Sequence, residues 1–270
     1  MKKNKNKKKK YKRQQSAYYF GGSIEIDRVC TGNYGAKGKG RVKKKKATPE
    51  EVALQNLYNR KRKLRRIIKD NYNENDYWTL LTYKKGYRTN VKDAKKDFTK
   101  FVRKLRREYR KRGQELKWVV RTDVGKKGAA HHHFLANRIP DGDILIKNCW
   151  TSIAGTGFPS YKPIYEEGGF DGLAYYIVKP SDAEEEAYSG YSRSRNLTVP
   201  EPEISRTTKK KMQEYPKAPP GWYIDADSVT MGINPITGYE YQHFVMFKLD
   251  TKKQAREPAP GGKKGDREDG

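Results

Sequence analysis

The stretch LKWVVRTDVGKKGAAHHHFLANRI, residues 116–139, holds two segments of apolar and β-branched residues around a short turn that contains glycine and lysine. Such segments predict strands, here over 116–124 and 131–139, and the sequence GKKGAA between them predicts a hairpin. The second strand opens with three consecutive histidines, although the whole chain has only four. The hairpin is therefore the starting point for both the fold and a candidate site.

The three histidines differ in direction, because successive side chains of a strand point to opposite faces of a sheet. His131 and His133 share one face, and His132 points to the other. Neutral imidazoles are common metal ligands, but two are rarely enough, and the partner strand can supply Asp123 as a carboxylate beside the pair. We therefore predict a metal site of two histidines and one carboxylate with open positions, and we expect His132 to be packed or solvated.

The remaining histidine and the two cysteines do not indicate a second site. Cys30 and Cys149 stand alone in the sequence, which argues against a zinc finger and against a disulfide framework, so both are expected to be reduced thiols. His243 is isolated in YEYQHFVMF, and we interpret it as structural.

Helical patterns flank the hairpin on both sides. ATPEEV offers Thr48 as N-cap, Pro49 at the first helical position and Glu51 three residues after the cap, which predicts a basic helix running to about Lys69. Apolar residues then recur at helical spacing from about 90 to 112, opposite a face dense in Lys and Arg. Shorter helices are predicted at GDILIKNCW, residues 142–150, and at FDGLAYYIVKP, residues 170–180.

Further strands are predicted at 76–83 and around YKPIYEE, and the segments GWYIDAD and YEYQHFVMFKL around NPITG predict a later hairpin. This order of elements is typical of the α+β class, an antiparallel sheet with helices packed on one face. Residues 1–20 and 251–270 are charged and show no sustained periodicity, so we expect a basic disordered tail and a second disordered tail. We expect residues 21–250 to form one domain with a flanking N-terminal helix and a C-terminal hairpin.

The charge of the chain indicates a polyanionic partner. Lys and Arg total 60 against 32 Asp and Glu, and the first 46 residues hold 17 basic and two acidic side chains. Nucleic acid is the commonest polyanion in a cell, and no stretch approaches the ~20 apolar residues of a membrane-spanning helix, so we expect no membrane contact. The basic N-terminus lacks the apolar segment of a signal peptide, which favours a cytoplasmic protein. Phosphate contacts are expected from Lys100, Arg103 and Arg107 on the 90–112 helix and from Arg193 and Arg195 in SRSRN.

The segment LAYYIVK, residues 173–179, offers a candidate nucleophile. On a helix Lys179 lies three residues after Tyr176 and four after Tyr175, so either phenol can sit one turn from the ammonium group. Adjacent helical residues diverge by about 100 degrees, so only one of the two can face the site. A phenol near a cation and a divalent metal can attack phosphorus, because both neutralise the developing charge.

Together these motifs resemble a known family. LLTY followed by a helix, then RTDVGKKGAAHHHFL and then YIVK, in that order, resemble the three motifs of the HUH endonucleases, specifically the rolling-circle replication initiators of plasmids and small phages. YSRSRNL and INPITGYEY are similar to replication-associated proteins of mobile elements related to filamentous-phage gene II protein. The motif resemblance covers about residues 76–180.

The resemblance implies a ferredoxin-like sheet that carries the histidine pair on a central strand. It implies that His131 and His133 bind the metal with Asp123 as the acid, although the acid in this family is more often Glu. It also implies a single-tyrosine enzyme with Tyr176 as the nucleophile, aided by Lys179, and leaves Tyr175 as the alternative. The expected cofactor is a divalent metal, Mg²⁺ or Mn²⁺.

The expected activity is strand-specific nicking and rejoining of single-stranded DNA at a replication origin, through a 5′-phosphotyrosine intermediate. The chain has no GxxxxGK[ST] motif, so we expect a host helicase to separate the strands and a host DNA polymerase to extend the freed 3′ end. Two alternatives stay open. One is a single-tyrosine transposase or relaxase, and the other is a non-catalytic basic nucleic-acid-binding protein.

Overall fold

The chain divides into two compact units in the computed structural model, one of Lys46–Glu201 and one of Met1–Lys45 together with Pro202–Gly270. We call them the histidine unit and the terminal unit, and each is described by itself. The expectation of one domain over residues 21–250 thus differs from the structure. The residues that the structure describes are 13–30, 47–87, 89–125, 128–153, 155–162, 164, 170–180, 190–208, 212–234 and 238–249.

The histidine unit is built on a five-stranded sheet in which all neighbouring strands are antiparallel. In spatial order the strands are β6 (Ser160–Lys162), β3 (Tyr77–Leu81), β5 (Ala130–Ala136), β4 (Trp118–Val124) and β7 (Tyr191–Arg193). With α2 (Val91–Lys111) and α3 (Gly142–Thr151), the chain order β3-α2-β4-β5-α3-β6 is the βαββαβ order of a ferredoxin-like layer. The α+β class is therefore confirmed, and the hairpin of β4 and β5 lies at the centre.

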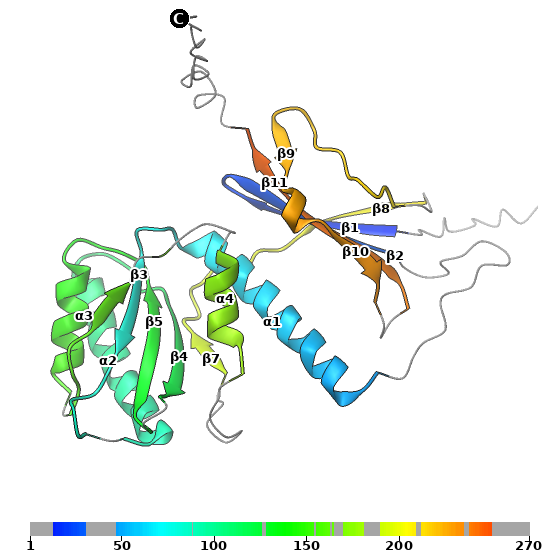
Figure 1. The fold of residues 1–270 in the computed structure, drawn as a ribbon. Coiled ribbons are helices and arrows are strands. Elements are labelled where there is room, and N and C mark those ends of the chain that lie inside the picture. Colours follow the sequence, from blue (N-terminus) through cyan, green and yellow to red (C-terminus); the bar gives the residue numbers. More distant parts are fainter. Residues whose placement is uncertain are drawn as a thin grey trace, which may run out of the picture. The chain divides into compact units, whose positions relative to one another are not determined.

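Helices cover both faces of this sheet (Figure 1). The expected layer is formed by α2 and α3, which pack on the face that carries Val120 and Phe134. The other face carries Val119 and Leu135, and it is covered by α1 (Pro49–Asn71) and α4 (Asp171–Val178). Both central strands present apolar side chains in both directions, so each face needs a cover to keep them from water.

The helix boundaries follow their local signals. Thr48 is the N-cap of α1, and the capping box with Glu51 is present, as the sequence predicts. Asn90 caps α2 by accepting a hydrogen bond from the backbone of Asp93. One face of α2 is buried, and its members are Ala94, Phe98, Phe101, Val102, Leu105 and Tyr109.

The terminal unit holds a second antiparallel sheet of six strands. Residues 13–20 were expected in the N-terminal tail, but they form β1, because β1 pairs along its length with β2 and also with β8. The segments GWYIDAD and YEYQHFVMFKL do pair, as β9 with β11, but the strand that directly precedes β11 and forms a hairpin with it is β10, which was not predicted. The bounds are β1 (Arg13–Phe20), β2 (Ser23–Cys30), β8 (Glu203–Thr207), β9 (Trp222–Ile224), the 3₁₀ helix η3 (Ala226–Ser228), β10 (Thr230–Ile233) and β11 (Glu240–Lys248).

The core of the terminal unit is small. Its buried members are Ala17, Ile24, Ile26, Phe244 and Met246, from three adjacent strands. Residues 1–12 and 250–270, which contain most of the expected tails, lie outside the described residues. Among the helices that the structure describes, none has the length and apolar character needed to cross a membrane.

Candidate active site

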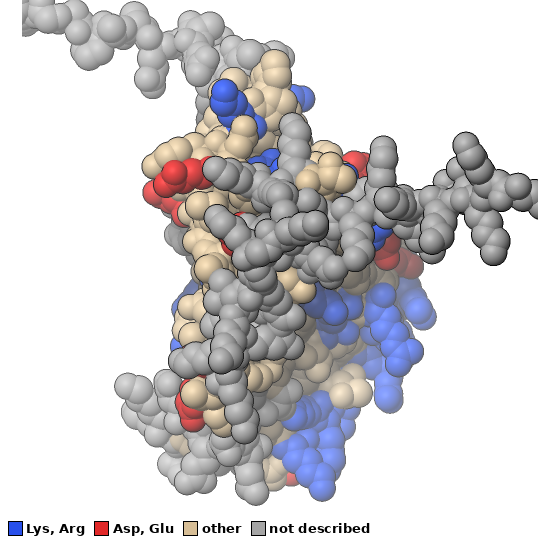
Figure 2. Space-filling view, turned by 90° about the vertical axis from the view of Figure 1, so that its right-hand side faces the viewer, with Lys and Arg blue, Asp and Glu red and all other residues tan. Residues whose placement is uncertain are grey.

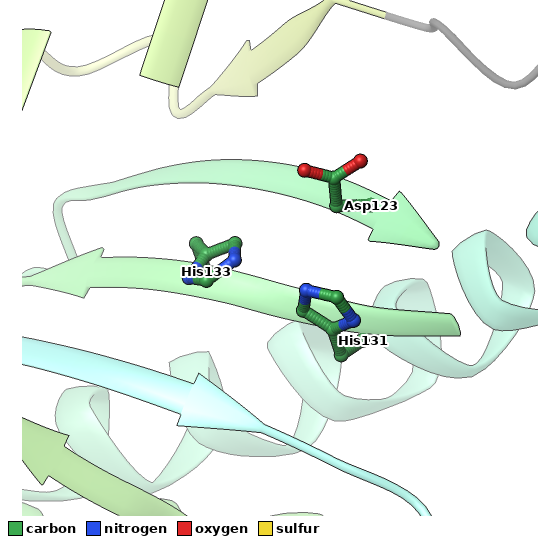
Figure 3. A group of neighbouring side chains, drawn as sticks. All are labelled: Asp123, His131 and His133. Atoms are coloured by element: carbon green, nitrogen blue, oxygen red, sulfur yellow. The ribbon is translucent and has the colours of Figure 1, made fainter. Parts of the chain in front are cut away.

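The hairpin register brings the predicted metal ligands together. Asp123 on β4 lies directly opposite His131 on β5, and Arg121 lies opposite His133. One ligand atom from each of Asp123, His131 and His133 lies within 4.8 Å of the other two (Figure 3). An imidazole pair with one carboxylate is a donor set that suits a divalent ion, and three such atoms can share one ion after small side-chain rotations.

Burial keeps the imidazole of His133 neutral. Its pKa is lowered to about 3, chiefly because burial disfavours the charged ring and secondly because His131 lies beside it. The neutral ring is the form that binds a metal, so the environment of His133 favours ligation near neutral pH.

His132 points to the opposite face, as the strand alternation predicts. It is fully buried, its Nδ1 lies 2.9 Å from Thr122 Oγ1, and its ring packs against Phe98 and Trp150. Burial lowers its pKa to about 3. His132 is therefore a packed core residue of the α2 and α3 face.

Helix α4 places one of the two tyrosines at the histidines. The Tyr176 hydroxyl lies 2.8 Å from His133 Nε2. The neutral imidazole accepts this hydrogen bond when its proton is on Nδ1, and donates it when the proton is on Nε2, which leaves Nδ1 available as a metal ligand. Lys179 Nζ lies 4.9 Å from the centre of the Tyr176 ring. Tyr175 is 46% exposed, and its ring lies 5.8 Å from Lys61 Nζ on α1.

The phenol of Tyr176 is protonated at rest. Burial raises its pKa above the usual value, and the negative charge of Asp123 adds to this rise, whereas Arg121 opposes it. An attack by this oxygen therefore needs extra positive charge near the site, from a metal ion or a neighbouring cation.

Arg121 is a residue of the site that the sequence analysis missed. Its guanidinium group is buried and pairs with Asp123, at 2.9 Å between Nη2 and Oδ2. Its Nη1 donates to the backbone oxygens of Tyr176 at 2.9 Å and of Lys179 at 2.6 Å. Arg121 thus satisfies carbonyls at the C-terminal end of α4 and joins that end to a metal-ligand candidate.

Trp78 is a second missed residue. Its ring stacks on His133 with the ring centres 5.7 Å apart, and it meets Tyr176 edge-on at 6.1 Å. The strand period could have indicated Arg121, two residues before Asp123 and so on the same face. The place of Trp78 depends on the pairing of β3 with β5. In that pairing Leu80 lies opposite His133, and Trp78, two residues before Leu80, shares its face.

The residues expected to contact DNA fall into separate groups. Lys100 forms an ion pair with Asp97 at 3.1 Å, whereas Arg103 and Arg107 are exposed on α2. Arg193 and Arg195 line a pocket together with Arg106 and Arg110 of α2, which the sequence analysis did not select. Figure 2 shows Lys and Arg side chains gathered in a dense group on part of the face in view.

The fourth histidine and the two cysteines lie outside this site. His243 Nδ1 lies 2.8 Å from Asp27 Oδ1 on the neighbouring strand, in agreement with its structural interpretation. Cys30 and Cys149 are buried free thiols.

Comparison with known proteins agrees with the motif order. Residues 75–181 match the model of a family described as replication-associated protein ORF2/gene II protein. The match covers β3, the histidine hairpin and α4, and thus every residue of the candidate site. No curated protein and no solved structure matches the chain significantly.

Proposed function

Because residues 75–181 match the replication-associated ORF2/gene II protein family, which supports a role in initiating replication, we propose that this chain nicks and rejoins one strand of DNA at a replication origin. The observation that carries the proposal is the 2.8 Å contact between the Tyr176 hydroxyl and His133 Nε2. A potential nucleophile thereby lies at a cluster of potential metal ligands. A binding protein without catalysis has no need for this arrangement.

In the proposed reaction the Tyr176 oxygen attacks the phosphorus of a phosphodiester. A bond forms between the phenol oxygen and phosphorus, and the bond from phosphorus to the 3′ oxygen breaks. The phenol loses its proton to water, and the leaving 3′ oxygen takes up a proton to become a hydroxyl. The product is a 5′-phosphotyrosine and a free 3′ end, and the reverse reaction rejoins the strand because the phosphodiester energy is kept in the new bond.

The residues of the chain have distinct tasks in this reaction. The neutral His133 ring and the edge of Trp78 hold the phenol in one orientation, and Lys179 stabilises the phenolate by its charge. Asp123, His131 and His133 would hold a divalent ion, Mg²⁺ or Mn²⁺. When bound, such an ion would polarise the scissile phosphate and offset its negative charge.

The test is covalent capture of DNA. Single-stranded oligonucleotides that tile the DNA flanking the gene are labelled at the 3′ end and incubated with the protein and Mn²⁺. We expect label to become attached to the protein, on a peptide that contains Tyr176. Tyr176→Phe should abolish the adduct and leave DNA affinity within about twofold, because one hydroxyl is lost and no charge changes.

Tyr175→Phe is the matched control, since it removes the same atom one residue away and should retain most of the adduct. Loss of the adduct in Tyr175→Phe alone would move the nucleophile by one position. If the wild-type protein carries no label after incubation with any of the tiled oligonucleotides, the nicking activity is refuted.

A further inference from the structure

The histidine unit has a second polar site, at the edge strand β7. A pocket of about 440 Å³ lies between the C-terminal half of α2 and the segment that follows β7. Four guanidinium groups line it, and we call this site the arginine pocket: Arg106, Arg110, Arg193 and Arg195. Trp118 and Ser194 add an aromatic surface and a hydroxyl group to the wall.

Three of the four arginines can be placed relative to the sheet, and they come from both of its faces. Arg106 and Arg110 come from α2, which covers the face of Val120. Arg193 lies opposite Val119 in the strand register, and Val119 belongs to the other face. Positive charge therefore lies on both sides of the sheet edge. This arrangement suits an extended anionic ligand that passes along the edge.

The pocket arginines have no acidic partner among the described residues, a property that they share with some other cations of α2, such as Arg103 and Arg107. Four cations of this helix region pair with acids one turn away, namely Lys96, Lys100, Lys111 and Arg112. Within the described chain, the pocket arginines have neither an ion pair nor a side-chain hydrogen bond. The one carboxylate in the wall, Glu115, accepts a hydrogen bond from Asn196.

Four like charges around one pocket repel each other, and a bound anion removes this cost. A guanidinium group presents a fixed fork of N–H donors that matches phosphate oxygens. The hydroxyl of Ser194 accepts from the Trp118 backbone N–H at 3.0 Å, so its own hydrogen can also be donated. The pocket therefore suits a phosphodiester backbone, whose successive phosphates each carry one negative charge, better than a single carboxylate on a protein partner.

We propose that the arginine pocket binds the phosphodiester backbone of DNA at a place separate from the nicking site. That the polyanion is DNA rests on the proposed function, whereas the preference for phosphates rests on the pocket itself. Trp118 begins β4 and Asp123 lies five residues further along the same strand, which corresponds to about 16 Å at roughly 3.3 Å per residue. A strand within a duplex spans this distance with about five nucleotides at roughly 3.4 Å each, and an extended unpaired strand needs fewer.

The first test measures binding with charge-removing pairs of substitutions. Arg106→Gln with Arg110→Gln, and Arg193→Gln with Arg195→Gln, each remove two charges from one wall of the pocket. Each pair should weaken binding of a single-stranded oligonucleotide, of a hairpin oligonucleotide or of both at least tenfold in fluorescence anisotropy, and should lower the slope of log affinity against log salt by about 1.5 for that oligonucleotide. The control pair, Lys84→Gln with Lys147→Gln, removes two exposed charges elsewhere in the unit and should cost less than threefold.

Oligonucleotide length and form provide the second test. Single-stranded and hairpin oligonucleotides are shortened on each side of the nick site. The pocket variants should have the same DNA affinity as the wild-type protein once fewer than about five nucleotides remain on the side that reaches the pocket. If only hairpins respond to the variants, the pocket holds a duplex stem, and if single strands respond, it holds the unpaired strand. Either response supports DNA backbone binding.

A loss of affinity in the control pair equal to that in the pocket pairs would overturn the proposal, because it would show general electrostatic attraction only. Binding and covalent capture are separate readouts. If pocket variants bind DNA weakly but still form the adduct at saturating DNA, DNA binding by the pocket is supported. If the wild-type protein binds DNA through the pocket but never forms an adduct, only the proposed nicking activity is contradicted.

Discussion

The three neighbouring histidines occupy different environments because a strand alternates its side chains. His131 and His133 lie beside Asp123 on the α4 face, whereas His132 is enclosed by aromatic rings on the α2 face. The chemistry of the three identical side chains is therefore set by position alone. This difference can be tested by comparing single substitutions.

We expect His131→Ala and His133→Ala each to abolish covalent capture of DNA and to weaken Mn²⁺ binding at least tenfold, since each removes one of three ligands. His132→Ala should retain Mn²⁺ affinity and lower the free energy of unfolding by about 2–4 kcal/mol, because it leaves a cavity in a packed core. Isothermal titration with Mn²⁺ and thermal unfolding measure the two effects. Equal loss of Mn²⁺ affinity in all three variants would contradict the assignment.

Arg121 joins the candidate nucleophile to the candidate metal ligands. Arg121→Lys keeps the charge but cannot pair with Asp123 and also satisfy two carbonyls of α4, so Tyr176 should lose its fixed position. We expect adduct formation to slow more than tenfold, with DNA affinity changed less than threefold. A change in affinity without a change in the single-turnover rate would exclude this positioning role.

Helix α4 is short, and contacts at both ends determine its position. At its N-terminal end the buried Phe170 has φ 63°, in the left-handed region, which a non-glycine residue adopts only when the surrounding packing supports it. Asp171 follows and forms ion pairs with Lys61 at 2.7 Å and Arg65 at 3.1 Å on α1. At the other end Arg121 binds the last carbonyls. The contacts of α4 with its neighbours thus place Tyr176.

Asp171→Asn should weaken the attachment of α4 to α1. The ion pairs are partly exposed, so we expect a loss of only about 1 kcal/mol in the free energy of unfolding, together with a several-fold slower adduct formation. The loss in the free energy of unfolding on Asp171→Asn should become smaller at high salt concentration, because salt already screens such pairs in the wild-type protein. An Asp171→Asn variant that unfolds and reacts like the wild-type protein would show that packing alone holds α4.

For two helices, the sequence predicted both their presence and where they begin. The capping box at Thr48 and the apolar spacing of α2 are local signals, and both helices begin within a residue or two of the expected position. The presence of α4 was also predicted. Which of its faces meets the sheet depends on α1, whose Leu64, Ile67 and Ile68 pack in the same core, and no local pattern encodes that contact.

At the level of the whole chain, the net charge of +28 is concentrated near the N-terminus. Because β1 begins at Arg13, a deletion that leaves β1 intact has to end at residue 12. Deleting residues 2–12 removes eight lysines, and we expect a weaker salt dependence of DNA binding with an unchanged nick position. Anisotropy at several salt concentrations and mapping of the adduct test this, and a shifted nick position would mean that the tail reads sequence.

The pattern of residues alone was sufficient to group Asp123, His131 and His133, because a hairpin brings neighbouring parts of the chain together and its two-residue period assigns each side chain a face. The pairing of Val29 with Tyr241 and the pairing of β1 with β8 join distant parts of the chain, so of the terminal unit only the late pair of strands was anticipated. The same holds for the arginine pocket, which combines α2 with residues beyond β7. Such contacts arise only when the elements pack, since their stabilisation comes from the burial of surfaces that lie far apart in the sequence.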